Sequence, residues 1–142
     1  IADESLVAHR LRTIPATANG ADTGGIGAIS AINEVPINDT NYLEFTAAGD
    51  RRSWVNSNPG VSGTIRALIV TCRAMRVDAT GPQKIKPYVL ISGTRYYGTT
   101  FTLTTSFAPY FYIWETNPAT GSPWTDAEIN NTAIQKGWEA VA

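Results

Sequence analysis

Hydrophobic and polar residues alternate along much of the chain, in short runs separated by turn-forming residues. The clearest alternation covers residues 64–77, whose middle is apolar at both odd and even positions. A strand with two apolar faces is typical of a central position covered on both sides, or of a bulge that moves it between faces. Other runs of strand type occur at 42–46, 51–56, 84–91, 95–97, 99–105, 107–114 and 133–141.

The beginning of the chain has a weaker pattern. Residues 5–14 alternate in part and are interpreted as an edge strand that ends at Pro15. Residues 16–25 contain an Asn-Gly and a Gly-Gly dipeptide, which predict a loop. In residues 26–35 three isoleucines are spaced by three, which suits one or two helical turns.

One helix is predicted near residues 125–132. Thr125 and Glu128 have the spacing of a capping box, in which each side chain accepts a hydrogen bond from the backbone N–H of the other. Trp124 precedes this box and is placed to pack on Ile129 one turn later. We therefore predict that Trp124, Thr125 and Glu128 are structural residues.

Together these elements predict an all-β fold: a jelly-roll-like antiparallel β-sandwich with one short helix in the C-terminal region. The chain has 142 residues, which is enough for one well-buried domain. We expect an extended N-terminal arm or edge strand over 1–25, followed by a single sandwich domain over 26–142. The arm is expected to contact a neighbouring subunit, with strand addition as one mode.

Composition narrows the classes of partner. Charged residues make up 16% of the chain and the net charge is −1, with no basic run longer than Arg51-Arg52. Nucleic-acid binding needs clustered positive charge, so no nucleic-acid partner is expected. No apolar run reaches the length of about 18 residues that a membrane span needs, so no membrane partner is expected. The single cysteine, Cys72, lies in an apolar run and is predicted to be a buried, unreactive thiol.

Candidate chemistry is sparse. His9 is the only imidazole, and its neighbours Arg10 and Arg12 disfavour the protonated form that a Ser-His-Asp site requires. One histidine and one cysteine cannot supply a zinc site, and no loop has the alternating acids of a calcium cage. Glu44 and Glu115 are the two acids within or next to strands, which is weak support for a glycosidase pair. We therefore expect a non-enzymatic protein with no metal site and no cofactor.

Aromatic residues at alternate strand positions leave two interpretations open. They either pack in the core or form a surface for protein contact or sugar stacking. The candidates for such a surface are Tyr96, Tyr97, Tyr110, Tyr112 and Trp114.

Residues 113–125, Ile-Trp-Glu-Thr-Asn-Pro-Ala-Thr-Gly-Ser-Pro-Trp-Thr, resemble a segment of small structural proteins from tailed bacteriophages and prophages. Three further segments of the chain resemble this group: the Asn-Glu-x-Pro-x-Asn-Asp loop from 33, the strand 65–77 and the Ser-Gly-Thr-Arg-Tyr hairpin at 92–96. The resemblance implies a virion component with a sandwich fold and no catalytic residues.

Two functions follow as expectations. The first is a non-enzymatic bacteriophage virion structural protein, either a capsid decoration or cement protein or a neck or tail component. It would be assembled in the bacterial host cytoplasm and would bind capsid or tail subunits and itself. The alternative is a carbohydrate-binding sandwich that adsorbs to a host or surface glycan. Burial of the aromatic residues of 107–114 favours the first function, and an exposed ladder of rings favours the second.

Overall fold

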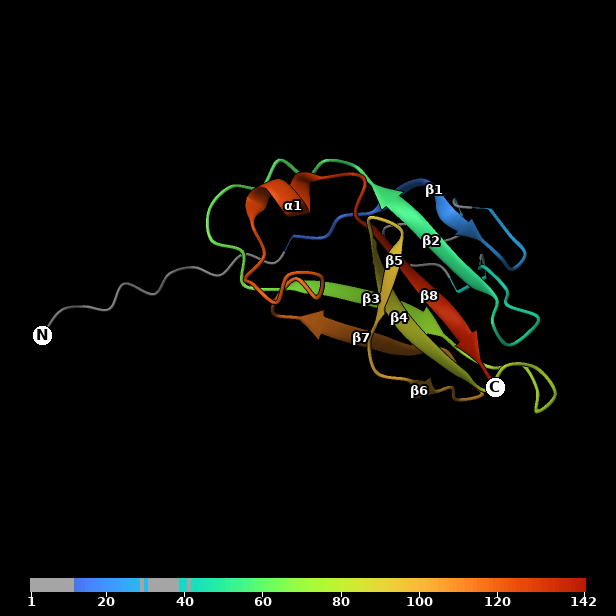
Figure 1. Ribbon diagram of the computed structural model, residues 1–142. Helices are drawn as coiled ribbons and strands as arrows, with labels where there is room; N and C mark the ends of the chain where they lie inside the picture. The colour runs from blue at the N-terminus through green and yellow to red at the C-terminus, as the bar shows by residue number, and fades with distance from the viewer. Residues whose placement is uncertain (1–11, 29, 31–38, 41) are drawn as a thin grey trace, which may run out of the picture.

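The computed structural model describes residues 12–28, 30, 39–40 and 42–142. Its described part is an antiparallel β-sandwich with one short helix near the C-terminus, which confirms the predicted fold class (Figure 1). The elements are β1 (Ala16–Thr23), β2 (Arg51–Asn56), β3 (Leu68–Ala74), β4 (Lys84–Ile91), β5 (Thr94–Tyr97), β6 (Phe101–Thr102), β7 (Ala108–Trp114), α1 (Asp126–Asn130) and β8 (Gln135–Val141).

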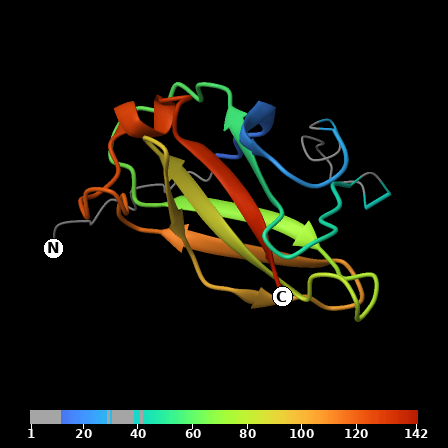
Figure 2. The ribbon, with the colours of Figure 1, turned by 45° about the vertical axis from the view of Figure 1, so that its right-hand side comes forward.

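The sandwich has one large and one small sheet, whose two layers can be followed in Figure 2. The large sheet has the strand order β1-β2-β8-β4-β5, with β6 also pairing with β4. The last strand of the chain therefore lies at the centre of the large sheet. In the small sheet β3 pairs with β7, from Leu68 opposite Trp114 to Ala74 opposite Ala108.

The core is built from inward-facing side chains of both sheets and from the segments that lead into and out of α1. Burying each large apolar side chain contributes roughly 1.5–3 kcal/mol, which makes this cluster the main source of stability. Its buried members are Leu68, Val70, Ile85, Val89, Leu103, Trp114, Trp124, Ile129, Ile134 and Trp138.

Residues 16–25 were predicted to be a loop, but 16–23 of them form β1. β1 pairs with β2 through an irregular register. A Cβ at Gly20 would lie 2.2 Å from the side-chain oxygen of Gln135 and 2.3 Å from Oγ of Ser53. Gly20 is thus needed for close approach to the sheet and does not mark a turn. The predicted arm of 1–25 overlaps this strand, whereas its residues 1–11 lie outside the described part.

β3 also differs from its prediction: it is shorter than the predicted strand 64–77 and does not lie at the centre of a sheet. Leu68 and Val70 face the core, whereas Ile69 on the opposite face is exposed. The second apolar face is therefore a surface and not a second buried side. Cys72 faces the core, and burial raises the pKa of its thiol, as expected for an unreactive cysteine.

Smaller elements also differ from the predictions. Residues 42–46 form no strand; Glu44 makes only an isolated bridge with Ile26. The predicted strand 99–105 is reduced to the two residues of β6. Most of 26–35 and most of the loop from 33 to 42 lie outside the described residues.

Pro87 lies in β4, which is an internal strand of the large sheet. Its carbonyl accepts a hydrogen bond from the N–H of Gly98 at 2.8 Å. The N–H and C=O positions of one strand residue point to the same side, so the missing N–H faces the place where the partner of β4 changes from β5 to β6. The pair of Pro87 and Gly98 therefore keeps only this one hydrogen bond, and the ladder between β4 and β5 ends there.

Two local motifs agree with the sequence. The β4–β5 hairpin turns at Ser92 and Gly93, which both have positive φ (50° and 83°), as a type I′ turn requires. The capping box of α1 is present: the Thr125 hydroxyl accepts from the Glu128 N–H at 3.2 Å, and the Glu128 carboxylate accepts from the Thr125 N–H at 2.9 Å.

Replacing Thr125 with alanine is expected to lower the free energy of unfolding by about 1 kcal/mol, because one N–H of the first turn loses its acceptor. Urea denaturation of the wild type and the variant measures this difference. Thr125→Ser keeps the hydroxyl and should retain most of the stability. Equal stability of Thr125→Ala and the wild type would show that the cap contributes nothing.

Candidate functional site

The two outer faces of the sandwich differ in chemical character. The outer face of the large sheet carries charged and hydroxyl groups that bond to each other, whereas the outer face of the small sheet exposes large apolar side chains. These two faces are the candidate surfaces for function.

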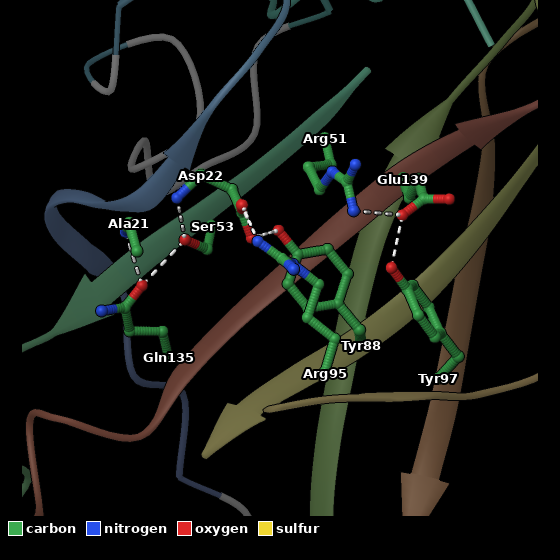
Figure 3. Close-up of polar contacts among 9 residues, drawn as sticks. All are labelled: Ala21, Asp22, Arg51, Ser53, Tyr88, Arg95, Tyr97, Gln135 and Glu139. Carbon is green, nitrogen blue, oxygen red and sulfur yellow. Dashed lines mark hydrogen bonds and ion pairs between the residues drawn. The ribbon is translucent and has the colours of Figure 1, made fainter. Parts of the chain in front are cut away.

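A polar network, here called the polar brace, links distant strands of the large sheet (Figure 3). Asp22 of β1 accepts hydrogen bonds from the Tyr88 hydroxyl of β4 at 2.8 Å and from both Nε and a terminal nitrogen of Arg95 on β5. The N–H of Asp22 donates to Oγ of Ser53 on β2, which donates to the side chain of Gln135 on β8. Since β1 and β5 are the first and last strands of the order, the ion pair spans the whole sheet.

Gly137 makes this network possible. The ring of Tyr88 reaches from β4 across β8, and a Cβ at Gly137 would lie 2.4 Å from its Cζ atom. Tyr88 is completely buried, and its hydroxyl and the Arg95 guanidinium meet at the Asp22 carboxylate (Figure 3). The Tyr88 ring therefore occupies the space that a side chain at position 137 would fill.

A second group of polar contacts surrounds Glu139 on the same face. Its carboxylate accepts from the Tyr97 hydroxyl at 2.5 Å and forms salt bridges with Lys86 at 3.0 Å and Arg51 at 3.5 Å. Burial acts to raise the pKa of Glu139, but the hydrogen bonds from Tyr97 and Lys86 outweigh it and the pKa is lowered. Lys86 also lies over the Tyr97 ring, 4.1 Å from its centroid.

The protonation states of the polar brace suit a structural role. The hydrogen bond from Arg95 lowers the pKa of Asp22, so this group is a carboxylate at neutral pH. Burial raises the pKa of Tyr88, and the neighbouring Asp22 carboxylate raises it further, so this hydroxyl keeps its proton. General acid–base catalysis needs a group that titrates near the working pH, and neither group does so.

The polar brace predicts a specific pH dependence. Since the pKa of Asp22 is depressed on folding, its contribution to stability is present above its unfolded pKa of about 3.9 and is lost as the pH falls through the folded value. Asp22→Asn should therefore lower the free energy of unfolding by about 2 kcal/mol at pH 7, and by progressively less below pH 4.

Urea denaturation at pH 7 and pH 3 measures this effect. Glu115→Gln, at an exposed position outside the network, is the matched control and should change little at either pH. An equal loss for Asp22→Asn at both pH values would show that the carboxylate charge does not contribute.

Lys136 is a buried amine that the sequence analysis missed. It is 7% exposed, lies on the same face of β8 as Trp138, and donates to the backbone carbonyl of Ile134 at 3.0 Å. Burial lowers the pKa of its amine to about 8. A lowered pKa is one property of a nucleophilic lysine, but here the amine is enclosed by the core and has no carboxylate partner among the described residues.

The outer face of the small sheet carries three exposed apolar side chains, here called the apolar patch. Phe111 is 56% exposed, Ile113 43% and Ile69 41%. Ile69 and Ile113 are directly opposite each other in the ladder, and Phe111 precedes Ile113 by two positions on β7. An exposed group of large apolar side chains of this kind is typical of an interaction surface.

A hollow of about 520 Å³ adjoins the apolar patch. It is lined by residues 109–113 of β7 together with Thr99 and Phe101. Because consecutive strand residues point to opposite faces, lining by five in a row places the hollow along the edge of β7 and not on one face. In the described part of the chain β7 pairs only with β3, so this edge has no strand partner.

The five predicted aromatic site residues do not form one surface. Tyr96 packs against the core, and Tyr97 lies on the outer face of the large sheet with Glu139. Tyr110, Tyr112 and Trp114 all face inward from β7, and the last two meet edge to face at 4.5 Å between ring centroids. The exposed large apolar residues of β7, Phe111 and Ile113, were in no predicted site, although they share the opposite face of the same alternating run.

The predicted structural residues lie together at the start of α1, and Trp124 is buried with its indole N–H donating to the Trp114 carbonyl at 2.8 Å. Across the residues with described positions, no group of three or more His, Cys, Asp or Glu could hold a metal ion. No helix in that same part has the length and apolar character needed to cross a membrane. Comparison of the chain with protein-family models, with curated proteins and with solved structures finds no match to any of them.

Proposed function

We propose that this protein is a non-enzymatic structural component of a bacteriophage virion that acts through protein–protein contacts. The observation that carries the proposal is the apolar patch beside the unpaired edge of β7. It exposes Phe111, Ile113 and Ile69 on a face without ionised groups at its centre. A surface of this kind loses unfavourable contact with water when another protein covers it.

The opposite face supports the same function. Its charges are paired within the polar brace and around Glu139, which stiffens the sheet without leaving a reactive group. One face then holds the domain rigid and the other is free to contact a neighbour. The inward positions of the half-buried Tyr112 and the buried Trp114 add support, because rings that pack inward from 107–114 favour a structural module over a sugar-binding ladder.

Localisation in particles tests the proposal. Antibodies against the purified chain would be used for immunogold electron microscopy of gradient-purified phage particles from a host that carries the gene. We expect labelling at one fixed position, on the head, neck or tail. A chain that is absent from the particles and stays in the soluble lysate would contradict the proposal.

The hollow along β7 supports the alternative, carbohydrate binding, because Phe101 and Phe111 contribute aromatic surface to it. A glycan-array screen followed by calorimetry distinguishes the two functions. A saccharide that binds the wild type and not a Phe111→Ala variant would favour adsorption to a glycan. Lack of binding across the array, together with labelled particles, would favour the structural function.

A further inference from the structure

The small sheet has two outer strands, and they differ in how their edges are occupied. Arg73 of β3 makes two hydrogen bonds with the carboxylate of Asp39, at 3.0 and 2.7 Å, which brings a loop residue to that strand. The free edge of β7 instead faces the hollow described above. Unpaired N–H and C=O groups along such an edge are a template for another strand.

β7 also lacks the usual protection of an edge strand. Proteins commonly place lysines or other charges on exposed edges to prevent pairing with another chain. No residue from Ala108 to Trp114 is charged, and Glu115 follows directly after the strand. Pro109 is the one residue there without an N–H donor, and it lies near the start of β7. Within Tyr110–Trp114, the alternate residues that point away from β3 therefore keep both their N–H and C=O groups at the edge.

The strand that best fits this edge is β7 of a second copy. An occupant must be uncharged, must be extended, and must continue the apolar patch on one face, and β7 itself has all three properties. Pairing a strand with itself about a two-fold axis gives a closed dimer, the commonest symmetry of protein oligomers. A different protein would need the same properties, but nothing in the chain selects for one.

The sequence of β7 also selects a register. An axis through Tyr112 pairs residues 110–114 antiparallel with 114–110 of the other copy. It places Phe111 of each chain opposite Ile113 of the other, so that apolar residues meet in the cross-strand pairs. It also places Glu115 opposite Pro109, which keeps the two glutamates at opposite ends of the paired region and avoids repulsion.

We propose that β7 pairs antiparallel with β7 of a second copy about a two-fold axis at Tyr112, forming a four-stranded sheet β3-β7-β7-β3. The inference deepens the proposed function, on which it rests, by naming self-association as the contact that the edge makes. The apolar patches of the two chains then form one continuous strip. A contact between two single strand edges is smaller than the roughly 1,200–2,000 Å² of a standard stable interface, so we expect a reversible dimer.

Sedimentation equilibrium of the purified chain at concentrations up to about 1 mM tests the dimer. We expect a monomer–dimer equilibrium whose dissociation constant rises at least about tenfold in Ile113→Lys, because the two ammonium groups would enter an apolar strip. Val77→Lys is the matched control: Val77 is 78% exposed in the loop that follows β3, outside the residues of the proposed pairing, and its variant should dimerise like the wild type. Circular dichroism verifies that both variants are folded.

Disulfide trapping tests the register. Chains carrying Phe111→Cys and chains carrying Ile113→Cys are oxidised separately and as a mixture. Directly opposite residues are close enough for a disulfide, whereas diagonal ones about 7–8 Å apart are not, so we expect covalent dimers in the mixture only. The wild type serves as control because its single cysteine faces the core.

Three results would overturn the inference: a monomer throughout the concentration range, a dimer that survives Ile113→Lys unchanged, or equal trapping of either cysteine variant alone. A chain that stays monomeric yet labels particles in the immunogold assay would remove the β7 pairing and leave the virion function intact. A chain that is absent from particles but forms the predicted dimer would contradict the virion function and leave the β7 pairing intact.

Discussion

Replacing Trp124 with alanine is expected to lower the free energy of unfolding by about 3–5 kcal/mol, the largest effect predicted for a single side chain of this protein. Trp124 is 3% exposed and belongs to the core cluster beside Ile129. Its removal leaves a large cavity between the small sheet and α1. It also removes the hydrogen bond that the indole N–H of Trp124 donates to the Trp114 carbonyl at 2.8 Å.

Chemical denaturation followed by far-ultraviolet circular dichroism measures the loss. Trp124→Phe is the matched variant, since it keeps an aromatic ring in the core and removes only the N–H and part of the volume, so its cost should be clearly smaller. A variant Trp124→Ala that retained full stability but failed to assemble would identify Trp124 as an interface residue and contradict its structural role.

Replacing Gly137 with alanine should cost about 3 kcal/mol, because the added Cβ has no space. It would lie 2.4 Å from Cζ of Tyr88 and 2.5 Å from the backbone oxygen of Arg52. The Tyr88 ring would have to leave its position across β8, and the hydrogen bond from its hydroxyl to Asp22 would be lost. The substitution therefore removes part of the polar brace without touching a charged group.

Gly81→Ala is the control, because the Cβ there would meet only the Asp78 side chain at 3.8 Å and the φ angle does not require glycine. It should change stability by less than about 0.5 kcal/mol. Thermal or urea denaturation compares the two variants. Equal stability of both would mean that β8 can move away from Tyr88 at little cost, and that the close approach does not constrain the sheet.

Both predictions concern the frame that presents the apolar patch. Trp124 connects α1 to the carbonyl of Trp114, the last residue of β7, and Gly137 allows the polar brace to hold the large sheet on the other side. A rigid frame lowers the entropic cost of presenting a binding surface. The proposed contacts of β7 therefore depend on residues that lie outside the interface itself.

Short-range features of this fold are readable from the sequence because their signals are local. Alternation and flanking turn residues locate β2, β4 and β7 close to their observed bounds. The hairpin at Ser92-Gly93 follows from turn chemistry, and the start of α1 follows from the Thr125–Glu128 capping box. In each case a few neighbouring residues satisfy one another's hydrogen bonds or backbone angles, whatever the rest of the chain does.

The tertiary structure alone decided which face of each strand is buried. A period of two shows that Phe111 and Ile113 share one face and Tyr112 and Trp114 the other, but all four are apolar, so the pattern cannot say which pair meets the core. The same ambiguity in β3 led to the incorrect central position. Burial depends on what the opposite sheet covers, and a two-stranded sheet has only one covered face.

Contacts between distant residues are the other feature that the sequence could not provide. The segment 16–23, with its small residues and Asn-Gly dipeptide, has the composition of a loop. It becomes a strand because Ser53 and Gln135 leave room only for a glycine at position 20. Asp22, Tyr88 and Arg95 meet although 73 residues separate the first from the last. The sequence determined the local elements and the overall class of the fold; long-range packing decided which face became charged and rigid and which remained apolar and exposed.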